Sequence, residues 1–412
     1  MKIALISRSN AIGGGASRVS EDLACWLNNV PGIIAHLWVD WPGKHPAPYH
    51  RWLSGNKWLY LILRCCRVLS RRVGLPDFLT PELIFFKLTK KDHYDLYHFH
   101  DISETFSPLA MRWIARRAPA VWTFHDSSPF TGGCLSTMEC TAYRTVCRNC
   151  PQLHRRHLMT SIDFTGAMQS YKRKTAQAGL ITPVTPSRWM ADQAIESRMF
   201  SIPPVVIPNG IDTDLFRPYD KRQVRMQLGL PQDEFIVLIS ANYLTEERKG
   251  GQYALDAINS CQRRVFILAV GNGGDSVTRR LPDRPAANTG FIGDLNKLSM
   301  YYAAADVFLF PSLVENCPLS ILETMACGTP AITFRSGGVP ELVTHRETGW
   351  IVEPKDTAGL TAGLQFCYDN SETLAEWARA GREKAESYDS RTVINHYLKL
   401  YQEVVSEKGK RR

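Results

Sequence analysis

Short apolar runs alternate along the chain with longer segments in which apolar residues recur at helical spacing. The short runs are typical of buried parallel strands, and the longer segments are typical of helices that cover such a sheet. The predicted strands are 3–6, 96–100, 120–124, 180–186, 235–240, 265–270, 289–292, 307–310, 331–334 and 349–352. Helices are predicted at 58–73, 107–117 and 187–200, and as a pair within 374–405 that is broken at 388–390. This pattern predicts an α/β protein with two doubly wound, Rossmann-like sheets.

The length of the chain supports the same division. A chain of 412 residues is long for a single core, so two domains of about 200 residues are expected. Residues 203–212, PPVVIPNGID, combine prolines with an Asn-Gly turn pair between two such halves. We expect the domain boundary there.

The segment 312–330, SLVENCPLSILETMACGTP, carries the clearest candidate chemistry. It follows a predicted strand with a polar turn that contains Glu315, and then with a helix that starts near Pro318 and Leu319 and contains Glu323. The N–H groups and the positive dipole end at such a helix start suit a phosphate, and a carboxylate further along can reach ribose hydroxyls. The segment therefore indicates a site for a nucleotide-sugar diphosphate. The alternative is a buried strand and an amphipathic helix with two solvated glutamates.

Two further features follow predicted strands in the first half. A glycine-rich turn with Gly14 and Gly15 leads into a helical pattern, and such a turn lets a bound group approach the backbone closely. It does not have the spacing of a dinucleotide-binding fingerprint, and a flexible surface turn is the alternative. His125 and Asp126 come at the carboxyl end of the predicted strand 120–124, where ligands bind in open α/β sheets. A buried structural histidine is the alternative for His125.

Several of these motifs resemble those of one family. The run ENCPLSILETMACGTP resembles the E-x7-E signature of the family-4 retaining glycosyltransferases of GT-B architecture. GGASRV, TFHD, IPNGID and the Lys249-Gly250 pair resemble family motifs in the same order. The resemblance implies two Rossmann-like domains facing a cleft. It implies an acceptor-binding domain at 1–205, a nucleotide-sugar-binding domain at 206–386, and a segment 387–412 whose helix crosses back to the first domain. The basic tail after Glu407 is expected to be disordered, as chain ends commonly are.

The resemblance also implies roles for individual residues. Glu323 would hold the ribose, and Glu315 would hold hydroxyls of the donor sugar. Arg248, Lys249 and the N–H groups near Leu319 would stabilise the leaving diphosphate, so that catalysis needs no metal or other cofactor. The loop with Gly14 and Gly15 would lie in the cleft, and His125 would lie beside the donor sugar. The family arginine expected five residues before Lys249 is Leu244 here, and Arg248 is the candidate to replace it.

Four cysteines, Cys134, Cys140, Cys147 and Cys150, lie close together in the sequence. Four thiolates in one loop suit a structural, tetrahedral Zn²⁺ site, whereas two disulfides or four free thiols are the alternatives. The segment resembles an insertion in bacterial capsule and exopolysaccharide transferases of the colanic-acid type. This resemblance implies that the acceptor is a saccharide or a lipid-linked saccharide in cell-surface polysaccharide synthesis.

The net charge of +9 and the isoelectric point near 9.0 predict an anionic partner. The basic residues are dispersed and no nucleic-acid-binding motif is present, so no nucleic acid is expected. A zinc-containing nucleic-acid-binding protein is therefore a remote alternative. Another enzyme of the same fold, a sugar phosphorylase or a nucleotide-sugar epimerase, is a nearer one.

The predicted helix 58–73 places Arg64, Arg67 and Arg71 on one stripe beside aromatic and aliphatic residues. Such a helix suits an anionic membrane surface, and a helix packed on its own domain is the alternative. No apolar run approaches the ~20 residues that span a bilayer. The start of the chain does not resemble a signal peptide. The expected location is cytoplasmic, peripheral on the inner face of the membrane.

Overall fold

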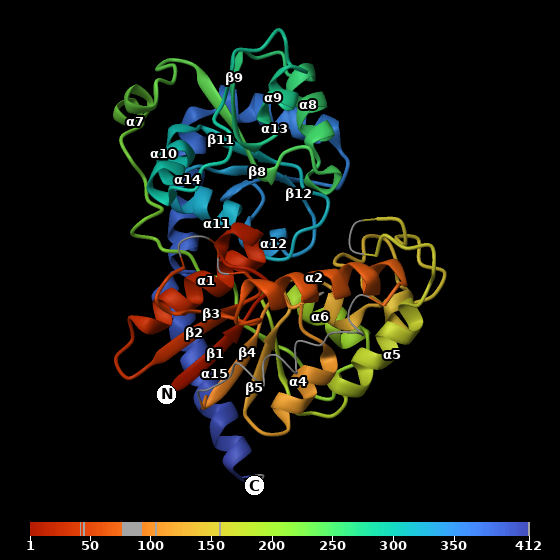
Figure 1. The fold of residues 1–412 in the computed structure, drawn as a ribbon. Coiled ribbons are helices and arrows are strands. Elements are labelled where there is room, and N and C mark those ends of the chain that lie inside the picture. The colour runs from red at the N-terminus through yellow and green to blue at the C-terminus, as the bar shows by residue number, and fades with distance from the viewer. Residues whose placement is uncertain (42, 44–45, 76–92, 104, 156–157, 411–412) are drawn as a thin grey trace. The chain divides into compact units, whose positions relative to one another are not determined.

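The computed structural model describes residues 1–41, 43, 46–75, 93–103, 105–155 and 158–410. These residues form two compact units, shown in Figure 1. The first unit consists of Met1–Pro208 and Ile394–Arg412, and the second unit consists of Asn209–Val393. Each unit is a parallel α/β sheet covered by helices, which confirms the predicted fold class.

In the described part of the first unit, seven strands form a parallel sheet in the order β3-β2-β1-β4-β5-β6-β7. Its strands are β1 (Lys2–Ile6), β2 (Ile34–Val39), β3 (His50–Trp52), β4 (Leu96–Phe99), β5 (Ala120–Thr123), β6 (Thr182–Thr185) and β7 (Val205–Val206). Its helices are α1 (Gly15–Asn28), α2 (Lys57–Arg72), α4 (Pro108–Ala115), α5 (Thr165–Ala176), α6 (Arg188–Glu196) and α15 (Ser390–Lys410). The strand order reverses at β1, so the topological switch point lies between β1 and β4.

In the second unit, six strands form a parallel sheet in the order β10-β9-β8-β11-β12-β13, counted over its described residues. Its strands are β8 (Phe235–Tyr243), β9 (Val265–Asn272), β10 (Ala286–Asn288), β11 (Val307–Phe310), β12 (Ala331–Phe334) and β13 (Gly349–Val352). Its helices are α7 (Lys221–Leu228), α8 (Gly251–Ser260), α9 (Gly274–Thr278), α10 (Leu295–Ala304), α11 (Leu319–Ala326), α12 (Val339–Leu342), α13 (Thr357–Asp369) and α14 (Ser371–Glu386). The switch point of this sheet lies between β8 and β11.

Helix starts follow the capping chemistry of the sequence. The side chain of Ser107 accepts a hydrogen bond from the N–H of Ala110 at α4, and that of Ser187 accepts one from Met190 at α6. The predicted strand 289–292 is wrong, because the strand lies earlier, at β10. Gly290 has φ +66°, a left-handed conformation that ends the extended backbone there.

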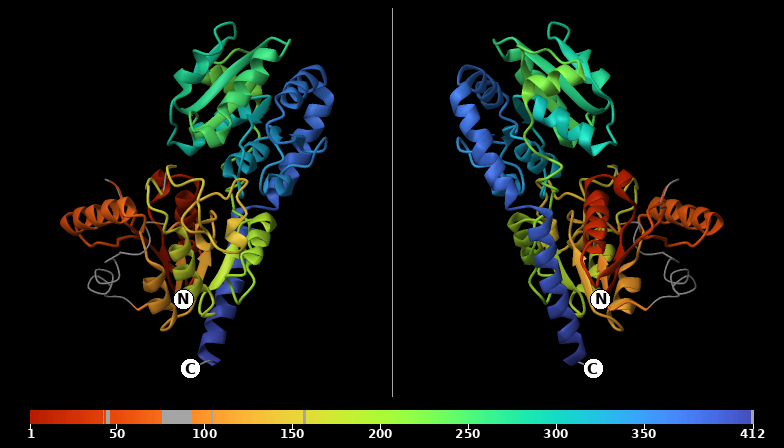
Figure 2. Two further views of the ribbon diagram at one scale, coloured as in Figure 1. Left: turned by 90° about the vertical axis from the view of Figure 1, so that its right-hand side faces the viewer. Right: turned by 90° about the vertical axis from the view of Figure 1, so that its left-hand side faces the viewer.

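The last helix, α15, packs against the first unit (Figure 2). The hydroxyl of Tyr401 lies 2.7 Å from Nδ1 of His98 on β4. Lys408 donates a hydrogen bond of 2.6 Å to the carbonyl oxygen of Ala115 at the end of α4. The tail predicted to be disordered after Glu407 is therefore helical to Lys410, and residues 411–412 lie outside the described residues.

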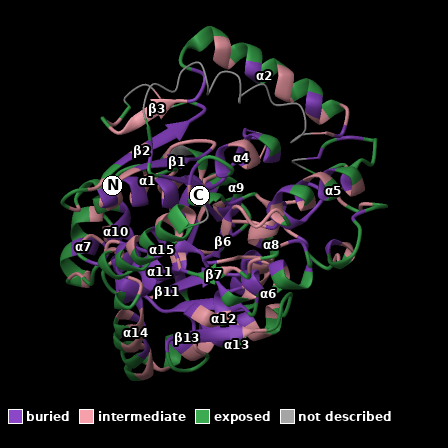
Figure 3. Cartoon of the chain, turned by 90° about the horizontal axis from the view of Figure 1, so that it is seen from below, coloured by how far each residue is buried: buried purple, intermediate pink, exposed green. Residues whose placement is uncertain are grey.

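Helix α2 lies at the periphery of the first unit and exposes much of its apolar surface (Figure 3). Trp58 is 79% exposed and Leu69 is 62% exposed. The predicted arginine stripe is wrong at Arg67, whose guanidinium makes two hydrogen bonds to Asp40 and lies on the inner side of the helix. In the described part of the chain, no helix is long and apolar enough to cross a membrane.

Candidate active site

Two charged side chains meet at the switch point of the second sheet. Lys249 lies in the short 3-10 helix η4 (Glu247–Lys249) after β8, and Glu315 lies in the turn after β11. The Nζ of Lys249 donates to Oε1 of Glu315 at 2.6 Å, and the hydroxyl of Ser312 donates to the same oxygen at 2.7 Å. Since ligands of doubly wound sheets bind at the carboxyl ends of the strands beside the switch point, this pair lies where a ligand is expected.

Backbone contacts that only glycine permits hold the surrounding loops together. Gly250 has φ +69°, and a Cβ there would collide with the carbonyl oxygen of Pro311. Gly337 has φ +58°, and a Cβ there would collide with the carbonyl oxygen of Glu315. The N–H of Leu313 also donates to the carbonyl of Arg248 at 2.9 Å. The loops after β8, β11 and β12 therefore pack backbone to backbone around the ion pair.

The electrostatics of the site favour a charged Glu315. Burial acts to raise the pKa of Glu315, but Lys249, Arg248 and the hydroxyl of Ser312 together hold that pKa below its usual value. The guanidinium of Arg248 lies 3.5 Å from Oε1 of Glu315 and donates to the carbonyl of Val314 at 3.1 Å. Leu244, which stands where the family has an arginine, is a buried apolar residue. The arginine that lies beside Glu315 is therefore Arg248.

Helix α11 starts directly after this turn. Pro318 is its N-cap, and in the described part of the chain no side chain caps the N–H groups of its first turn, which begins at Leu319. Glu323, one turn further, is only 2% exposed and interacts electrostatically with the thiol of Cys327. The helix is buried on nearly every side rather than amphipathic, because α10 and α14 both pack against it. The predicted ribose contact of Glu323 stays a prediction.

The first unit brings two histidines together at the ends of neighbouring strands. His100 follows β4, His125 follows β5, and the ring atoms Nδ1 of His100 and Nε2 of His125 lie 3.0 Å apart. The two rings are stacked with an interplanar angle of 18°. Burial lowers the pKa of His125 to about 4, and burial together with His98 and His125 lowers the pKa of His100 well below its usual value. Both rings are therefore neutral at pH 7, and one donates its N–H to the other.

Two aspartates lie next to the histidines. The pKa of Asp126 is raised to about 6, first by burial and then by the nearby Asp101, against the hydrogen bonds from Ser128 and the charge of Lys172. Burial also raises the pKa of Asp101, whose carboxylate lies 3.2 Å from the guanidinium of Arg8. Such perturbed carboxyl groups at strand ends are typical of functional sites. Sequence reasoning did not select His100 or Asp101, although both end a predicted strand as His125 does.

The glycine-rich turn leads into α1 as predicted. Gly14 is the N-cap with φ +108°, and no side chain among the described residues caps the helix. A Cβ at Gly14 or at Gly15 would meet no atom of the described chain within 4 Å. The start of α1 thus leaves room for a bound group, which is what the predicted donor contact of these glycines needs.

The four cysteines, Cys134, Cys140, Cys147 and Cys150, line one pocket in the first unit. All four are free thiols. Among the described residues, no three side chains of His, Cys, Asp or Glu are arranged so that they could hold a metal ion as they stand. The zinc site therefore stays a prediction.

Residues 13–215 match the family model described as Glycosyltransferase Family 4. Residues 234–370 match the model described as Glycosyl transferases group 1. The chain therefore contains both of these glycosyltransferase domains, the first mostly in the first unit and the second in the second unit.

Sequence relatives carry several different activities in their names. The sulfoquinovosyl transferase of Arabidopsis thaliana is 28% identical over 44% of this chain and 36% of its own length. N-acetyl-alpha-D-glucosaminyl L-malate synthase of Bacillus anthracis is 27% identical over 48% of this chain and 53% of its own length. A GDP-mannose-dependent monoacylated alpha-(1-6)-phosphatidylinositol monomannoside mannosyltransferase of Corynebacterium glutamicum is 32% identical over 47% of this chain and 54% of its own. The matches span about half or less of these relatives.

Solved structures share the fold over nearly the whole chain. Sucrose-phosphate synthase of Thermosynechococcus elongatus has a TM-score of 0.75 at 21% identity, over 99% of this chain and 100% of its own. HepE of Anabaena, solved with UDP-glucose, has a TM-score of 0.67 at 19% identity, over 98% and 100%. WaaG, a glycosyltransferase involved in lipopolysaccharide biosynthesis, has a TM-score of 0.62 at 14% identity, over 97% of this chain and 99% of its own. The fold is that of the GT-B glycosyltransferases.

Proposed function

We propose that this chain, with its family 4 and group 1 glycosyltransferase domains, is a retaining hexosyltransferase that uses a nucleotide-diphosphate sugar. The proposed acceptor is a saccharide or lipid-linked saccharide of a cell-surface polysaccharide. The observation that carries the proposal is the pairing of Lys249 with Glu315, beside Arg248, at the switch point of the second sheet. This is where a doubly wound sheet binds a nucleotide.

The arrangement suits departure of a nucleoside diphosphate. Negative charge develops on the diphosphate as the bond to the sugar breaks. Lys249, Arg248 and the N–H groups at the start of α11 supply fixed positive charge and hydrogen-bond donors for it. Glu315 binds donor sugar hydroxyls and Glu323 binds the ribose. On this proposal no catalytic metal is needed, so activity should persist without added divalent cations.

The donor is best identified by a panel of UDP-, GDP- and ADP-sugars. HepE was solved with UDP-glucose, whereas the Corynebacterium relative is named for GDP-mannose, so both bases belong in the panel. Release of nucleoside diphosphate with formation of a glycoside is the expected result. Proton NMR of the product should show the anomeric configuration of the donor. An inverted configuration would refute the retaining assignment.

The same panel separates the enzymes that share the fold. An epimerase would change the sugar without releasing nucleoside diphosphate and without an acceptor. A phosphorylase would require inorganic phosphate and would produce a sugar phosphate. Either result would overturn the proposed transfer reaction.

The acceptor side of the proposal uses the first unit. His125, which the family resemblance places beside the donor sugar, and its neighbour His100 are both neutral at pH 7, so their rings can exchange hydrogen bonds with uncharged sugar hydroxyls. WaaG supports a polysaccharide role by its name, whereas other relatives are named for malate or inositol phosphate acceptors. An acceptor panel that contains lipid-linked saccharides, malate and inositol phosphate tests this part. Transfer only to the small acceptors would refute the polysaccharide role.

Helix α2 supports a place at an anionic membrane. Its outward face carries the exposed Trp58, Ile62 and Leu69, and the exposed Arg64 and Arg72 lie on the same helix. Apolar side chains flanked by arginines suit the interface of an anionic bilayer.

A vesicle assay tests the membrane part. The variant Arg64→Gln/Arg72→Gln should bind phosphatidylglycerol vesicles more weakly than the wild type, and high salt should weaken wild-type binding in the same way. Arg67→Gln is not a suitable probe, because this residue pairs with Asp40. Equal vesicle binding by both proteins would leave α2 as a helix without a membrane role.

A further inference from the structure

The four cysteines converge on one place although they are separated along the loop that follows β5. Cys134, Cys140, Cys147 and Cys150 all line the same pocket. Cys134 interacts electrostatically with Cys147 and Cys150, and both of these interact with Cys140. Each thiol therefore interacts with at least two of the others inside the one pocket.

The backbone turns between the last two cysteines. Asn149, between Cys147 and Cys150, has φ +52°, so the chain reverses within this C-x2-C segment. A backbone N–H from Gly132 points to the sulfur of Cys147, and one from Gln152 points to that of Cys150.

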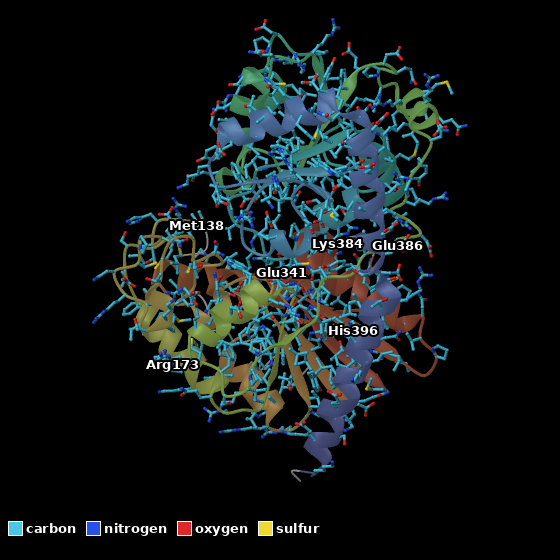
Figure 4. All side chains as sticks on the ribbon, turned by 180° about the vertical axis from the view of Figure 1, so that it is seen from behind. Met138, Arg173, Glu341, Lys384, Glu386 and His396 are labelled. Carbon is cyan, nitrogen blue, oxygen red and sulfur yellow. The ribbon has the colours of Figure 1, made fainter. Side chains whose placement is uncertain are left out.

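The cysteine loop, residues 131–150, is tied to α5 at several points. The side chain of Gln169 on α5 accepts the N–H of Cys147 at 2.8 Å and donates to the carbonyl of Tyr143 at 2.9 Å. Arg173, labelled in Figure 4 together with Met138 of the loop, donates to the carbonyl of Thr145 at 3.1 Å. These contacts fix the backbone positions from which the four thiols reach the pocket.

A buried cation also lies close by. Lys172 on α5 is buried, its Nζ donates to the carbonyls of Ser128 and Thr131, and its charge acts on both Cys134 and Cys147. Four thiolates around Zn²⁺ carry two net negative charges. Lys172 offsets part of this charge without competing as a ligand.

We propose that Cys134, Cys140, Cys147 and Cys150 bind one Zn²⁺ in a closed, tetrahedral site. A cysteine has a single side-chain torsion, and a change of rotamer moves its sulfur by about 3 Å. On this proposal, side-chain rotations of this size bring the four sulfurs from the walls of the pocket to the metal. A Cys₄ site leaves no open coordination position, so the role of the metal is structural.

The site lies next to the chain segment that carries His125, the histidine predicted to lie beside the donor sugar. The N–H of Ser127, two residues after His125, donates to the carbonyl of Leu135, the residue after Cys134. Lys172 links the same stretch to α5. Zinc bound to the cysteine loop thus fixes the chain that leaves His125 and Asp126.

Metal analysis tests the proposal without any substrate, so its result does not depend on the proposed function. Protein purified without chelators should contain about one zinc per chain by elemental analysis. Replacement of zinc by Co²⁺ should give the intense sulfur-to-cobalt absorption and the visible bands of a tetrahedral tetrathiolate. Cys140→Ser, at a half-exposed position, should lose the metal and these bands, whereas Cys65→Ser on α2 should retain both.

Three results would overturn the proposal. The first is a metal-free protein with eleven free thiols after denaturation, and the second is a metal-free protein in which four thiols appear only after reduction, which would indicate disulfides. The third is stoichiometric zinc that Cys140→Ser, Cys134→Ser and Cys147→Ser all retain. If one variant does not fold, the other two variants and the cobalt spectrum of the wild type still show whether the cysteines bind the metal. Loss of zinc should lower turnover while leaving nucleotide affinity, measured by calorimetry, unchanged.

Discussion

The contact between Lys249 and Glu315 gives the most direct test of the candidate site, because both its strength and its pH dependence follow from the structure. The two atoms are 2.6 Å apart, and the side chains are 21% and 11% exposed. Solvent therefore screens the pair only in part. We expect a double-mutant cycle of Lys249→Met and Glu315→Gln to give a coupling energy of about 1–3 kcal/mol at pH 7.

The remaining partners of Glu315 limit how much stability the single variant Lys249→Met can lose. Removing one member of an isolated buried ion pair costs about 3–5 kcal/mol, because the other charge is left without a partner. In Lys249→Met the carboxylate retains the hydroxyl of Ser312 at 2.7 Å and Arg248 at 3.5 Å. The single variant should therefore lose less than that range, about 2 kcal/mol.

The pH dependence has a definite sign. The pKa of Glu315 is lowered in the folded state from its usual value of 4.5. The stabilisation is therefore fully present above pH 4.5, and it is lost as the pH falls through the lower folded pKa. In Lys249→Met the pKa of Glu315 should rise, so that this variant loses less stability on acidification than the wild type.

Urea unfolding of the four proteins at pH 7 and at pH 3.5 measures these quantities, with equal m-values as the check that the cycle is valid. A coupling below about 0.3 kcal/mol at pH 7 would refute the ion pair as a stabilising contact. An equal coupling at the two pH values would refute the assignment of the effect to the charge of Glu315.

The remaining predictions concern the neighbouring loops and the two units. Gly250→Ala should destabilise the fold by about 3 kcal/mol or more, because its Cβ would collide with a backbone carbonyl. Gly229→Ala is the control, since Gly229 has a similar φ but open space around it, and it should cost only about 1 kcal/mol. Equal losses of stability in urea unfolding would refute the collision. Glu323→Ala should weaken donor binding by about 1–3 kcal/mol in calorimetry, and unchanged affinity with an intact circular dichroism spectrum would remove Glu323 from the site. The pKa of Asp126 is raised to about 6, so activity that needs its carboxylate should fall as the pH drops through 6; a wild-type pH profile in Asp126→Asn would exclude this role.

Strands buried on both faces were the most predictable elements. The strands β11, β12 and β13 lie at their predicted residues because each is a short, mostly apolar and buried run. Strand β2 was not predicted, since a histidine interrupts its apolar residues and its first residue, Ile34, is exposed. The prediction of a strand at 289–292 relied on its apolar residues. It was wrong because Gly290 adopts a left-handed turn conformation, which a hydrophobic pattern does not reveal.

Partners that lie far apart in the sequence could not be predicted from local patterns. The helical period of α2 placed Arg67 with Arg64 and Arg71, but it cannot show that Asp40 lies within reach of Arg67 alone. The pairing of His100 with His125 likewise depends on β4 lying next to β5, which no local motif encodes.

The two sheets share a strand order, and this explains why the candidate residues recur at equivalent places. Each sheet starts in its middle, adds two strands on one side, and then returns to the other side of the first strand. Because the fourth strand lies beside the first, the loop after the first strand opens beside the loop after the fourth in both sheets. In the second unit these loops carry Lys249 and Glu315, and in the first they carry the Gly14 turn and His100. The topology therefore brings the residues together. In the second unit, the glycine contacts at Gly250 and Gly337 determine how closely the loops approach one another. A change to those glycines should consequently disturb donor binding even though neither has a side chain to offer a ligand.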